Sequence, residues 1–411
     1  METMLRNDIP ERPEPLMTRS GALARSLWNL DPRILHLNHG SFGAVPHATL
    51  ERRIELQRET EAAPVKWFVN VYERLETARR HVAAWLHTNP DTMAFVPNAS
   101  AGASVVERAL RFGPGDEIVV TDHGYGAVVM GAEFRAMQTG ASIVRVHIPL
   151  GASDDDIVAR IAAALGEHTR LVIVDQITSA TATLFPAQRI AQLVHGQSAA
   201  RVLVDGAHAP GLIEDDPAAI GADYWIGNLH KFACAPRGCA VLIAGSKALA
   251  DELHPLIDSW NPQGPFGPRF NEQGTLDYTS FITAPISYDT LDRELGGWPS
   301  IRDYVNRLAD YGQYVVADAF AHHTGRDHMV SLPNPAPAMR LVRLPAPLGC
   351  DHDSSDGLRR PMLEQGNAEC AFTCFDGKGY LRLSSHAYNT AADYEEFAER
   401  CVPLLMEWSR S

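Results

Sequence analysis

The sequence predicts an α/β fold built on an open, mostly parallel β-sheet. Short runs rich in apolar and β-branched residues recur through the first two-thirds of the chain. Segments with helical periodicity fill the gaps between these runs, which is the pattern of strand–helix–strand units. Because the runs are apolar throughout, they are typical of strands that are buried on both faces of a parallel sheet covered by helices.

Seven runs are the predicted strands of this sheet. They lie at residues 94–97, 117–121, 142–146, 171–174, 202–204, 224–226 and 240–243. The crossover helices between them are predicted at residues 102–112, 126–137, 155–165 and 187–194. These elements make a large domain at residues 37–285, which follows an N-terminal arm at residues 1–36 with prolines at positions 10, 13 and 15.

The pattern changes near residue 285. A long amphipathic helix is predicted at residues 301–322, shorter strands at 339–344, 371–374 and 380–383, and a last helix at 392–408. Residues 286–411 therefore form a small C-terminal α+β domain. Two segments, the Gly/Pro-bearing 261–271 and the polar 351–366, are predicted to be loops.

Composition excludes several classes of function. The net charge of −14 in 411 residues disfavours binding to nucleic acid or to an anionic membrane. No apolar run reaches the ~18 residues that span a bilayer, and the first residues lack the apolar core of a signal peptide. The six cysteines are irregularly spaced, so we expect reduced thiols in a cytoplasmic protein.

Three groups of residues could be taken for metal ligands. Cys370 and Cys374 lie in an alternating run that is typical of a strand with core thiols. The histidine pair at 322–323 and the segment 351–353 lack the ligand spacing of a metal site and are interpreted as solvated surface. No metal site is expected.

Asp205 and Lys231 indicate the chemistry of the site. Asp205 ends the run at 202–204, and Lys231 follows the run at 224–226. A strand-end lysine can form a Schiff base with the aldehyde of pyridoxal 5'-phosphate (PLP), and a strand-end carboxylate can keep the pyridine nitrogen protonated. Only four of the 36 basic residues are lysines, and arginine cannot form a Schiff base because it stays protonated.

Other strand ends offer further contacts to such a cofactor. Segment 98–104, Asn-Ala-Ser-Ala-Gly-Ala-Ser, opens a predicted helix, and free N–H groups at a helix N-terminus can bind phosphate. An ordinary capped helix would look the same. Tyr125 could stack on the pyridine ring, although the turn around it is equally compatible with a simple helix cap. Ser179 and His208 could reach the 3'-oxygen of the cofactor.

Six motifs in this order resemble the class V aminotransferase family of fold-type-I PLP enzymes, in its isopenicillin N epimerase-like branch. They are Asn-Ala-Ser-Ala-Gly at 98–102, Thr-Asp-His-Gly-Tyr-Gly-Ala at 121–127, Asp-Gly-Ala-His-Ala-Pro-Gly at 205–211, Asn-Leu-His-Lys at 228–231, Ala-Pro-Arg-Gly-Cys at 235–239 and Gly-Thr-Leu-Asp at 274–277. The resemblance extends from the segment 37–43 to the segment 381–385.

The resemblance implies a role for each matching residue. Lys231 would hold PLP, Asp205 would pair with its ring nitrogen, and His208 and Ser179 would lie beside its 3'-oxygen. Tyr125 would stack on the ring. The phosphate would be bound by Ser100, Ala101, Asn228 and His230, and by Thr275 of the neighbouring subunit. Arg382 would bind the substrate carboxylate, with Asn38 and His39 beside it.

The sequence departs from the family pattern at two positions. Gly124 stands where the family often has Glu, and Leu276 stands where it commonly has Arg. The cysteine desulfurases of this class need a reactive cysteine in a mobile loop. Cys370 and Cys374 lie in a predicted strand instead, which disfavours persulfide chemistry.

The resemblance implies a homodimeric enzyme that shares its active sites between subunits and acts on a small amino-acid substrate. We expect β-elimination at the C–S bond of a bulky cysteine S-conjugate, in secondary metabolism, because the two predicted loops would lengthen the rim of the site. Epimerisation and decarboxylating deamination are the alternatives, and simple transamination is disfavoured. A non-catalytic PLP-fold protein is disfavoured because Lys231 and Asp205 are both present.

Overall fold

The computed structural model describes residues 9–214 and 216–410. The chain divides into two compact units. The larger unit contains Phe42–Ser179 and Thr183–Thr290. The smaller unit contains the described residues up to Ser41, the short piece Ala180–Ala182, and the described residues from Leu291 onward. The domain limits at 36/37 and 285/286 stay predictions.

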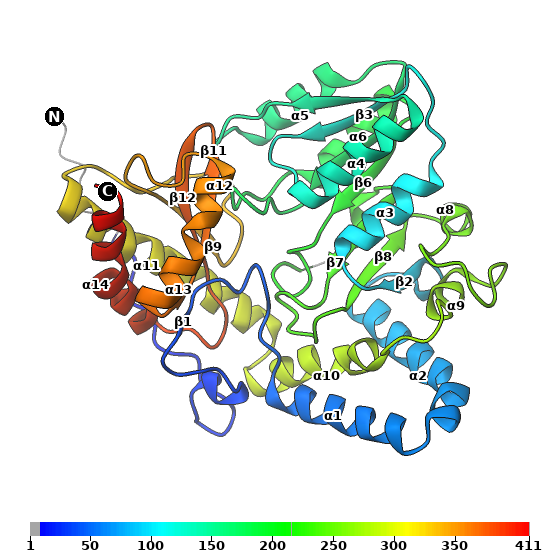
Figure 1. Ribbon diagram of the computed structural model, residues 1–411, viewed down its shortest axis with the longest axis horizontal. Helices are drawn as coiled ribbons and strands as arrows, with labels where there is room; N and C mark the ends of the chain where they lie inside the picture. The colour runs from blue at the N-terminus through cyan, green and yellow to red at the C-terminus, as the bar shows by residue number, and fades with distance from the viewer. Residues whose placement is uncertain (1–8, 215, 411) are drawn as a thin grey trace. The chain divides into compact units, whose positions relative to one another are not determined.

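A seven-stranded sheet forms the centre of the larger unit (Figure 1). Its strands, in spatial order, are β2 (Met93–Val96), β8 (Ala240–Ala244), β7 (Tyr224–Asn228), β6 (Arg201–Asp205), β5 (Thr169–Asp175), β3 (Glu117–Thr121) and β4 (Ser142–Val146). β8 runs antiparallel to both of its neighbours, and the five strands from β7 to β4 are parallel. The predicted mostly parallel sheet of seven strands is confirmed.

Helices cover this sheet. α3 (Ala99–Ala109) and α4 (Gly126–Thr139) pack against each other and share an apolar core with the sheet. α5 (Asp154–Ala164) and α6 (Ala187–Gln197) form a second packed pair, which contacts β4, β5 and β6. Figure 1 shows these helices lying along the strands. The chain moves across the sheet in opposite directions through the two pairs, so right-handed crossovers place them on opposite faces.

Further helical segments complete the larger unit. They are α1 (His47–Ala62), α2 (Pro64–Trp85), the 3₁₀ turn η2 (Pro90–Thr92), α7 (Pro217–Ile220), α8 (Lys247–Glu252), α9 (Phe266–Asn271) and α10 (Thr279–Glu294). α10 contains Pro285 and crosses the limit between the two units. No described helix has the length and apolar character of a membrane span.

Local capping explains where α3 begins. The side chain of Asn98 accepts a hydrogen bond of 2.9 Å from the N–H of Ala101, which is the contact of an N-cap residue. The helix therefore starts at Ala99, three residues before the predicted start. It stops at Ala109, before the Gly-Pro pair at 113–114. The backbone is already extended at Leu110, with ψ of 138°, so the helix does not reach the predicted end at 112.

The smaller unit is the predicted C-terminal α+β fold. Its antiparallel sheet contains β11 (Ala371–Phe375), β12 (Lys378–Ser384) and β9 (Met339–Arg343), with β12 in the centre. α11 (Trp298–Thr324) and α14 (Ala391–Trp408) lie side by side (Figure 1). The 3₁₀ turn η1 (Ala24–Leu27) belongs to this unit, and β1 (Leu35–His36) pairs in parallel with β10 (Ala368–Glu369).

The prediction of a loop at residues 351–366 is wrong. Two short helices, α12 (His352–Gly357) and α13 (Arg359–Gly366), occupy this segment. Asp351 and Ser354 form a capping box, in which each side chain accepts a backbone N–H of the other residue. This local signal outweighs the polar composition that favoured a loop. The segment 261–271 is irregular only up to Pro265, and α9 begins at Phe266.

Glu107 is a buried acid on α3 that no ion pair stabilises within the described residues. It is 3% exposed, and its Oε1 has no hydrogen-bond partner in the described parts of the chain. A Cβ at Gly131 of α4 would lie 3.1 Å from Oε2, so this glycine makes room for the carboxyl group. Burial raises the pKa of Glu107 to about 7, although Arg135 and Arg108 oppose the shift.

We expect the free energy of unfolding to fall as the pH rises and Glu107 ionises. Its pKa is higher in the folded than in the unfolded state, so the folded state binds more protons between these two pKa values. The free energy of unfolding then falls as the pH rises from about 4.5 to about 7, by about 3 kcal/mol. Urea unfolding at pH 5 and pH 8 should show this loss in the wild type and not in Glu107→Gln. Glu252→Gln, at an exposed position, is the control, and an equal loss in Glu107→Gln would refute the assignment.

Candidate active site

Lys231 is the one buried lysine of the chain. It lies in the turn after β7 and is 8% exposed, whereas Lys66, Lys247 and Lys378 are exposed. Its Nζ lies 3.1 Å from Nε2 of His208, within hydrogen-bond distance. Burial of an amine disfavours its charged form, which helps a lysine act as a nucleophile or base.

Asp205 ends β6 and is 2% exposed. Its Oδ1 accepts a hydrogen bond of 2.9 Å from the N–H of Ala207. Its Oδ2 is buried and has no hydrogen-bond partner among the residues that the structure describes. Burial raises the pKa of Asp205, and the Ala207 N–H and the charge of Lys231 act in the opposite direction. A buried carboxylate oxygen of this kind is suited to accept a hydrogen bond from a bound ligand.

Tyr125 and Ser179 are linked by a residue that the sequence reasoning missed. Nζ of Lys231 lies 5.8 Å from the centre of the Tyr125 ring. The carboxyl group of Asp175, at the end of β5, accepts hydrogen bonds from the backbone N–H groups of both Tyr125 and Ser179. Asp175 ends its strand as Asp205 ends the next, so the same strand-end signal was available in the sequence.

The first turn of α3 lies beside the end of β7. The side-chain oxygen of Asn228 accepts a hydrogen bond of 2.9 Å from the N–H of Ala99. The N–H of Ala101 is bound by the cap residue Asn98. Both predicted phosphate ligands of this turn, Ser100 and Ala101, are therefore placed at a helix N-terminus, but the Ala101 N–H is already in use.

His230 is buried in a setting that disfavours its charged form. Its Nδ1 lies 2.9 Å from the carbonyl oxygen of Cys239 and must donate to it. Burial lowers the pKa of His230 to about 4, and the nearby positive charges of Lys231 and Arg237 add to the effect. A neutral ring that donates from Nδ1 presents a lone pair at Nε2. His230 could therefore bind a phosphate as a donor only if the ring takes up a proton.

Gly43 lies against the backbone of the turn that carries Lys231. Its N–H donates to the carbonyl oxygen of His230 at 3.1 Å. A Cβ at this position would lie 2.3 Å from the carbonyl oxygen of Lys231 and 2.6 Å from that of His230. No side chain fits, because both obstacles are backbone atoms. Thr275, by contrast, is exposed between α9 and α10, and its role stays a prediction.

Arg382 belongs to the smaller unit, on the central strand β12. It is 3% exposed, so it is not a surface residue. Its Nη2 donates to Oδ1 of Asn38 and to Oγ of Ser41, both at 3.0 Å. A Cβ at Gly40 would lie 2.8 Å from Oγ of Ser384 and 3.5 Å from Nη2 of Arg382, so the segment can approach the strand closely. Ser41 is a further residue that the sequence reasoning missed.

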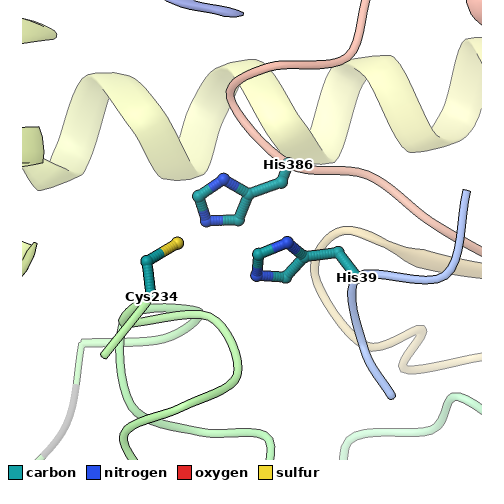
Figure 2. Close-up of side chains that lie close together, drawn as sticks. All are labelled: His39, Cys234 and His386. Carbon is teal, nitrogen blue, oxygen red and sulfur yellow. The ribbon is translucent and has the colours of Figure 1, made fainter. Parts of the chain in front are cut away.

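His39, the third predicted substrate contact, lies in a buried aromatic group. Figure 2 shows its ring face to face with that of His386, with centroids 3.9 Å apart and planes at 18°. Cys234, drawn in the same view, belongs to the other unit. Nδ1 of His39 lies 2.9 Å from the hydroxyl of Tyr388, and Trp28 packs edge-on against His386 and Tyr388. The ring of His39 is therefore held rigidly beside the Arg382 contacts at Asn38 and Ser41.

Comparison with known proteins identifies the family. The profile of the aminotransferase class-V family matches residues 46–261, which is more than half of the chain. The chain belongs to the class-V aminotransferase family. This family uses PLP, and PLP is the cofactor of this protein.

Individual relatives of this class-V protein are distant but nearly full-length. It is 28% identical to isopenicillin N epimerase of Streptomyces clavuligerus, over 93% of this chain and 98% of the other. It is 25% identical to L-cysteine desulfhydrase of Arabidopsis thaliana, over 91% of this chain and 88% of the other. The structure of the cystine C–S lyase C-DES with its product cysteine persulfide matches with a TM-score of 0.78 at 20% identity, over 90% and 98% of the two chains, and shows the shared fold.

The residues of the class-V protein fit PLP. The buried Oδ2 of Asp205 has no partner among the described residues, and the protonated pyridine nitrogen of PLP could donate to it. A buried lysine stands near the same carboxylate, and an aromatic ring lies over the lysine amine. Asp205 would hold the ring nitrogen and Lys231 the aldehyde carbon, and PLP would supply an electron sink for charge that develops at the substrate Cα.

Proposed function

We propose that this protein cleaves the C–S bond of an L-cysteine derivative by PLP-dependent β-elimination. In the net reaction, R–S–CH₂–CH(NH₃⁺)–COO⁻ and water give the thiol R–SH, pyruvate and ammonium. The Cα–H and Cβ–S bonds break: the electron pair of the Cα–H bond forms the Cα=Cβ double bond, and the pair of the Cβ–S bond leaves with the sulfur as thiolate, which takes up a proton. Hydrolysis of the resulting enamine gives pyruvate and ammonium. The observation that carries the proposal is the single buried lysine, whose amine lies 3.1 Å from the His208 ring.

Three side chains have distinct roles in this proposal. Lys231 would take the proton from Cα of the substrate, because it is the one buried residue among the four lysines. His208 orients the amine of Lys231 through its Nε2. Asp205 would pair with the cofactor ring nitrogen through its buried Oδ2. Tyr125 and Ser179 would bind the ring and its 3'-oxygen, and Ser100 and Asn228 would bind the phosphate. Ala101 and His230 would join them only if the Ala101 N–H is shared with Asn98 and the His230 ring takes up a proton.

The relatives favour sulfur chemistry, and the cysteines of this chain disfavour the desulfurase variant of it. One relative is an L-cysteine desulfhydrase. Cys370 is buried, Cys374 lies within β11, and burial raises the pKa of both thiols. Because the thiolate is the nucleophile, neither residue is suited to attack sulfur and carry a persulfide. The proposal is therefore a thiol product that is released rather than a persulfide on Cys370 or Cys374.

Epimerisation is the second candidate, because the 28% identical relative is an isopenicillin N epimerase. It requires removal of the same Cα proton by Lys231. It differs in the next step, since a proton must return from the other face of Cα while the Cβ substituent stays in place. A substrate without a leaving group on Cβ can only follow this second route or exchange its α-hydrogen.

A panel of amino acids separates these reactions. The PLP-loaded protein is incubated in D₂O with L-cysteine, S-methyl-L-cysteine, S-benzyl-L-cysteine and L-alanine. Thiol, pyruvate, ammonia, CO₂, optical rotation and α-deuterium are measured for each substrate. We expect thiol, pyruvate and ammonia in equal amounts from the S-benzyl conjugate. Inversion or exchange without thiol would replace elimination by epimerisation, and CO₂ in step with turnover would indicate decarboxylation.

Substrate size is part of the same test. We propose a bulky S-substituent, and therefore a higher kcat/KM for S-benzyl-L-cysteine than for L-cysteine. Of the two segments expected to lengthen the rim, only residues 261–265 lack regular structure, while 351–366 is helical. Equal or better turnover of free L-cysteine would assign the protein as a simple desulfhydrase. Secondary metabolism as the setting is tested by the functions of the neighbouring genes.

We propose that Arg382 binds the substrate carboxylate, supported by Asn38, His39 and Ser41. The guanidinium is buried and its Nη2 is fixed by two hydrogen bonds, which suits a planar carboxylate. Arg382→Ala should raise KM about tenfold or more and also lower kcat, because a loosely held Cα–H loses its alignment. Arg382→Lys should rescue only in part, since an ammonium cannot bind in a bidentate way.

The control for Arg382 is Arg343→Ala, at an exposed position of the same sheet. Arg343→Ala should leave KM and kcat within about twofold of the wild-type values. PLP content and the melting temperature of each variant show whether the fold is intact. Wild-type KM in a folded Arg382→Ala protein would remove Arg382 from the substrate site.

We propose a homodimer in which Thr275 of one subunit reaches the PLP phosphate of the other. The support is the exposed position of Thr275 next to Gly274, whose φ of +97° favours glycine. Thr275→Ala should raise the PLP dissociation constant several-fold without changing the sedimentation coefficient. A fully PLP-loaded, active monomer in sedimentation experiments would contradict this arrangement.

A further inference from the structure

Two buried carboxyl groups end neighbouring strands in the same register. Asp175 of β5 pairs with Asp205 of β6 at the last position of the parallel ladder. The two residues are 3% and 2% exposed. Because residues paired in register project to the same face, and parallel strands lie about 4.8 Å apart, their side chains are neighbours. Asp205 is the proposed partner of the ring nitrogen, whereas Asp175 has no role in the chemistry so far.

Asp175 ties together two turns that carry proposed cofactor contacts. One turn follows β3 and leads to Tyr125, and the other follows β5 and leads to Ser179. The backbone N–H groups of both residues donate to the carboxyl group of Asp175. A single side chain at the end of a buried strand therefore sets the backbone position of both. The side chain of Tyr125 does not fix this backbone position itself, because it makes no capping hydrogen bond to α4.

The turn before Tyr125 closes directly on this carboxyl group. A Cβ at Gly124 would lie 2.7 Å from Cγ2 of Val129 and 3.1 Å from the carbonyl oxygen of Thr121. It would also lie 3.9 Å from Oδ1 of Asp175. A side chain at 124 would therefore displace the turn. The glycine that departs from the family pattern is the residue that lets this turn lie against Asp175.

Electrostatics decides the charge state of the pair. Two adjacent carboxyl groups in a water-poor site cannot both ionise easily. Burial, followed by the charge of Asp205, raises the pKa of Asp175 well above its usual range, against the hydrogen bonds from Tyr125 and Ser179 and the charge of Lys231. The groups that face Asp175 are Asp205 on β6 and Lys231 after β7, with His208 next to the lysine amine.

We propose that Asp175 is a positioning residue for PLP, which holds the turns of Tyr125 and Ser179 by their backbone N–H groups. Because two carboxyl groups buried side by side in register cannot both ionise easily, Asp175 is the neutral member of the pair. Asp205 then carries the negative charge at the end of the sheet. This inference rests on the proposed placement of PLP beside Lys231 and Asp205. It assigns to Asp175 no contact with substrate or with the reacting atoms.

Two variants separate position from charge. Asp175→Asn has the shape of the neutral acid and keeps an acceptor oxygen, whereas Asp175→Ala removes the acceptor. In the PLP-loaded protein, we expect Asp175→Asn to release PLP within about threefold of the wild-type rate, and Asp175→Ala to release it about tenfold faster or more. The visible absorbance band of the lysine-bound cofactor, titrated from pH 6 to 10, should keep its midpoint in Asp175→Asn.

The direction of the shift in the titration midpoint distinguishes an ionised from a neutral Asp175. An ionised Asp175 would stabilise the protonated lysine nitrogen, so removing its charge would lower the midpoint of the titration. A lowered midpoint or fast PLP release in Asp175→Asn would therefore overturn the neutral-acid part of the proposal. If Asp175→Ala released PLP at the wild-type rate, the proposal that Asp175 positions the cofactor would be overturned. If Asp175→Ala does not fold, judged by its melting temperature, the Asn variant decides.

A double variant tests whether Asp175 acts through Tyr125. Tyr125→Ala and Asp175→Ala should each increase the rate of PLP release. The fold increase in the double variant should be smaller than the product of the two single fold increases. Multiplicative effects would mean that Asp175 does not act through Tyr125. PLP release and the absorbance titration do not depend on which reaction is catalysed. A failure of the C–S lyase assignment would leave these results unchanged, so the two failures are distinguishable.

Discussion

Lys231→Ala should lower turnover of a cysteine conjugate by about a thousandfold or more, because general base catalysis alone contributes about 10² to 10⁴. The variant also loses the group that holds the aldehyde carbon of PLP. We therefore expect no visible absorbance band of lysine-bound PLP, while some PLP stays bound through its phosphate. Borohydride reduction of the wild type followed by peptide mapping should place the label on Lys231.

The exposed lysines provide the matched control for Lys231. Lys247 forms an ion pair with Asp251 on α8, at 2.7 Å, and is exposed. Lys247→Ala should keep the absorbance band and wild-type turnover. A borohydride label on Lys66, Lys247 or Lys378 would refute the assignment of Lys231.

Asp205→Asn should lower kcat by about a hundredfold or more, with the fold intact. The carboxylate would form a charge-assisted hydrogen bond with the ring nitrogen, and such bonds contribute about 1.5–3 kcal/mol before any catalytic effect is counted. An amide cannot keep that nitrogen protonated, so the cofactor becomes a weaker electron sink. Steady-state kinetics and the PLP dissociation constant measure the two effects separately.

The control for Asp205 is Asp251→Asn, at an exposed position of the same unit. It should leave kcat and PLP binding unchanged. Activity of Asp205→Asn within about tenfold of the wild type, equal to about 1.4 kcal/mol of barrier, would show that another group supports the ring nitrogen.

The local pattern of the sequence was sufficient to predict the sheet. Fully apolar runs such as 202–204 can only be buried on both faces, which indicates parallel strands between helices. Asp205 and Lys231 stood out because each polar residue follows such a run. The same reasoning applied to Asp175, but an acid at one more strand end has no evident meaning until the register places it beside Asp205.

Local composition misled the prediction at 351–366. Its polar residues suggested a loop, whereas the capping box at Asp351 and Ser354 starts a helix there. The sequence contained this capping signal, and in this segment it is a better guide to local structure than the polar composition. The start of α3 shows the same effect on a smaller scale, since Asn98 caps the helix three residues before its apolar periodicity begins.

The sequence by itself determined the elements, the family motifs and the residue types of the site, because these depend on patterns within short segments. Only the tertiary structure decided burial and charge. It shows that Arg382 is buried, that Gly43 faces the carbonyl of Lys231, and that burial lowers the pKa of His230. Each of these properties depends on atoms from segments far apart in the chain, and desolvation and close contact arise only when those segments pack together.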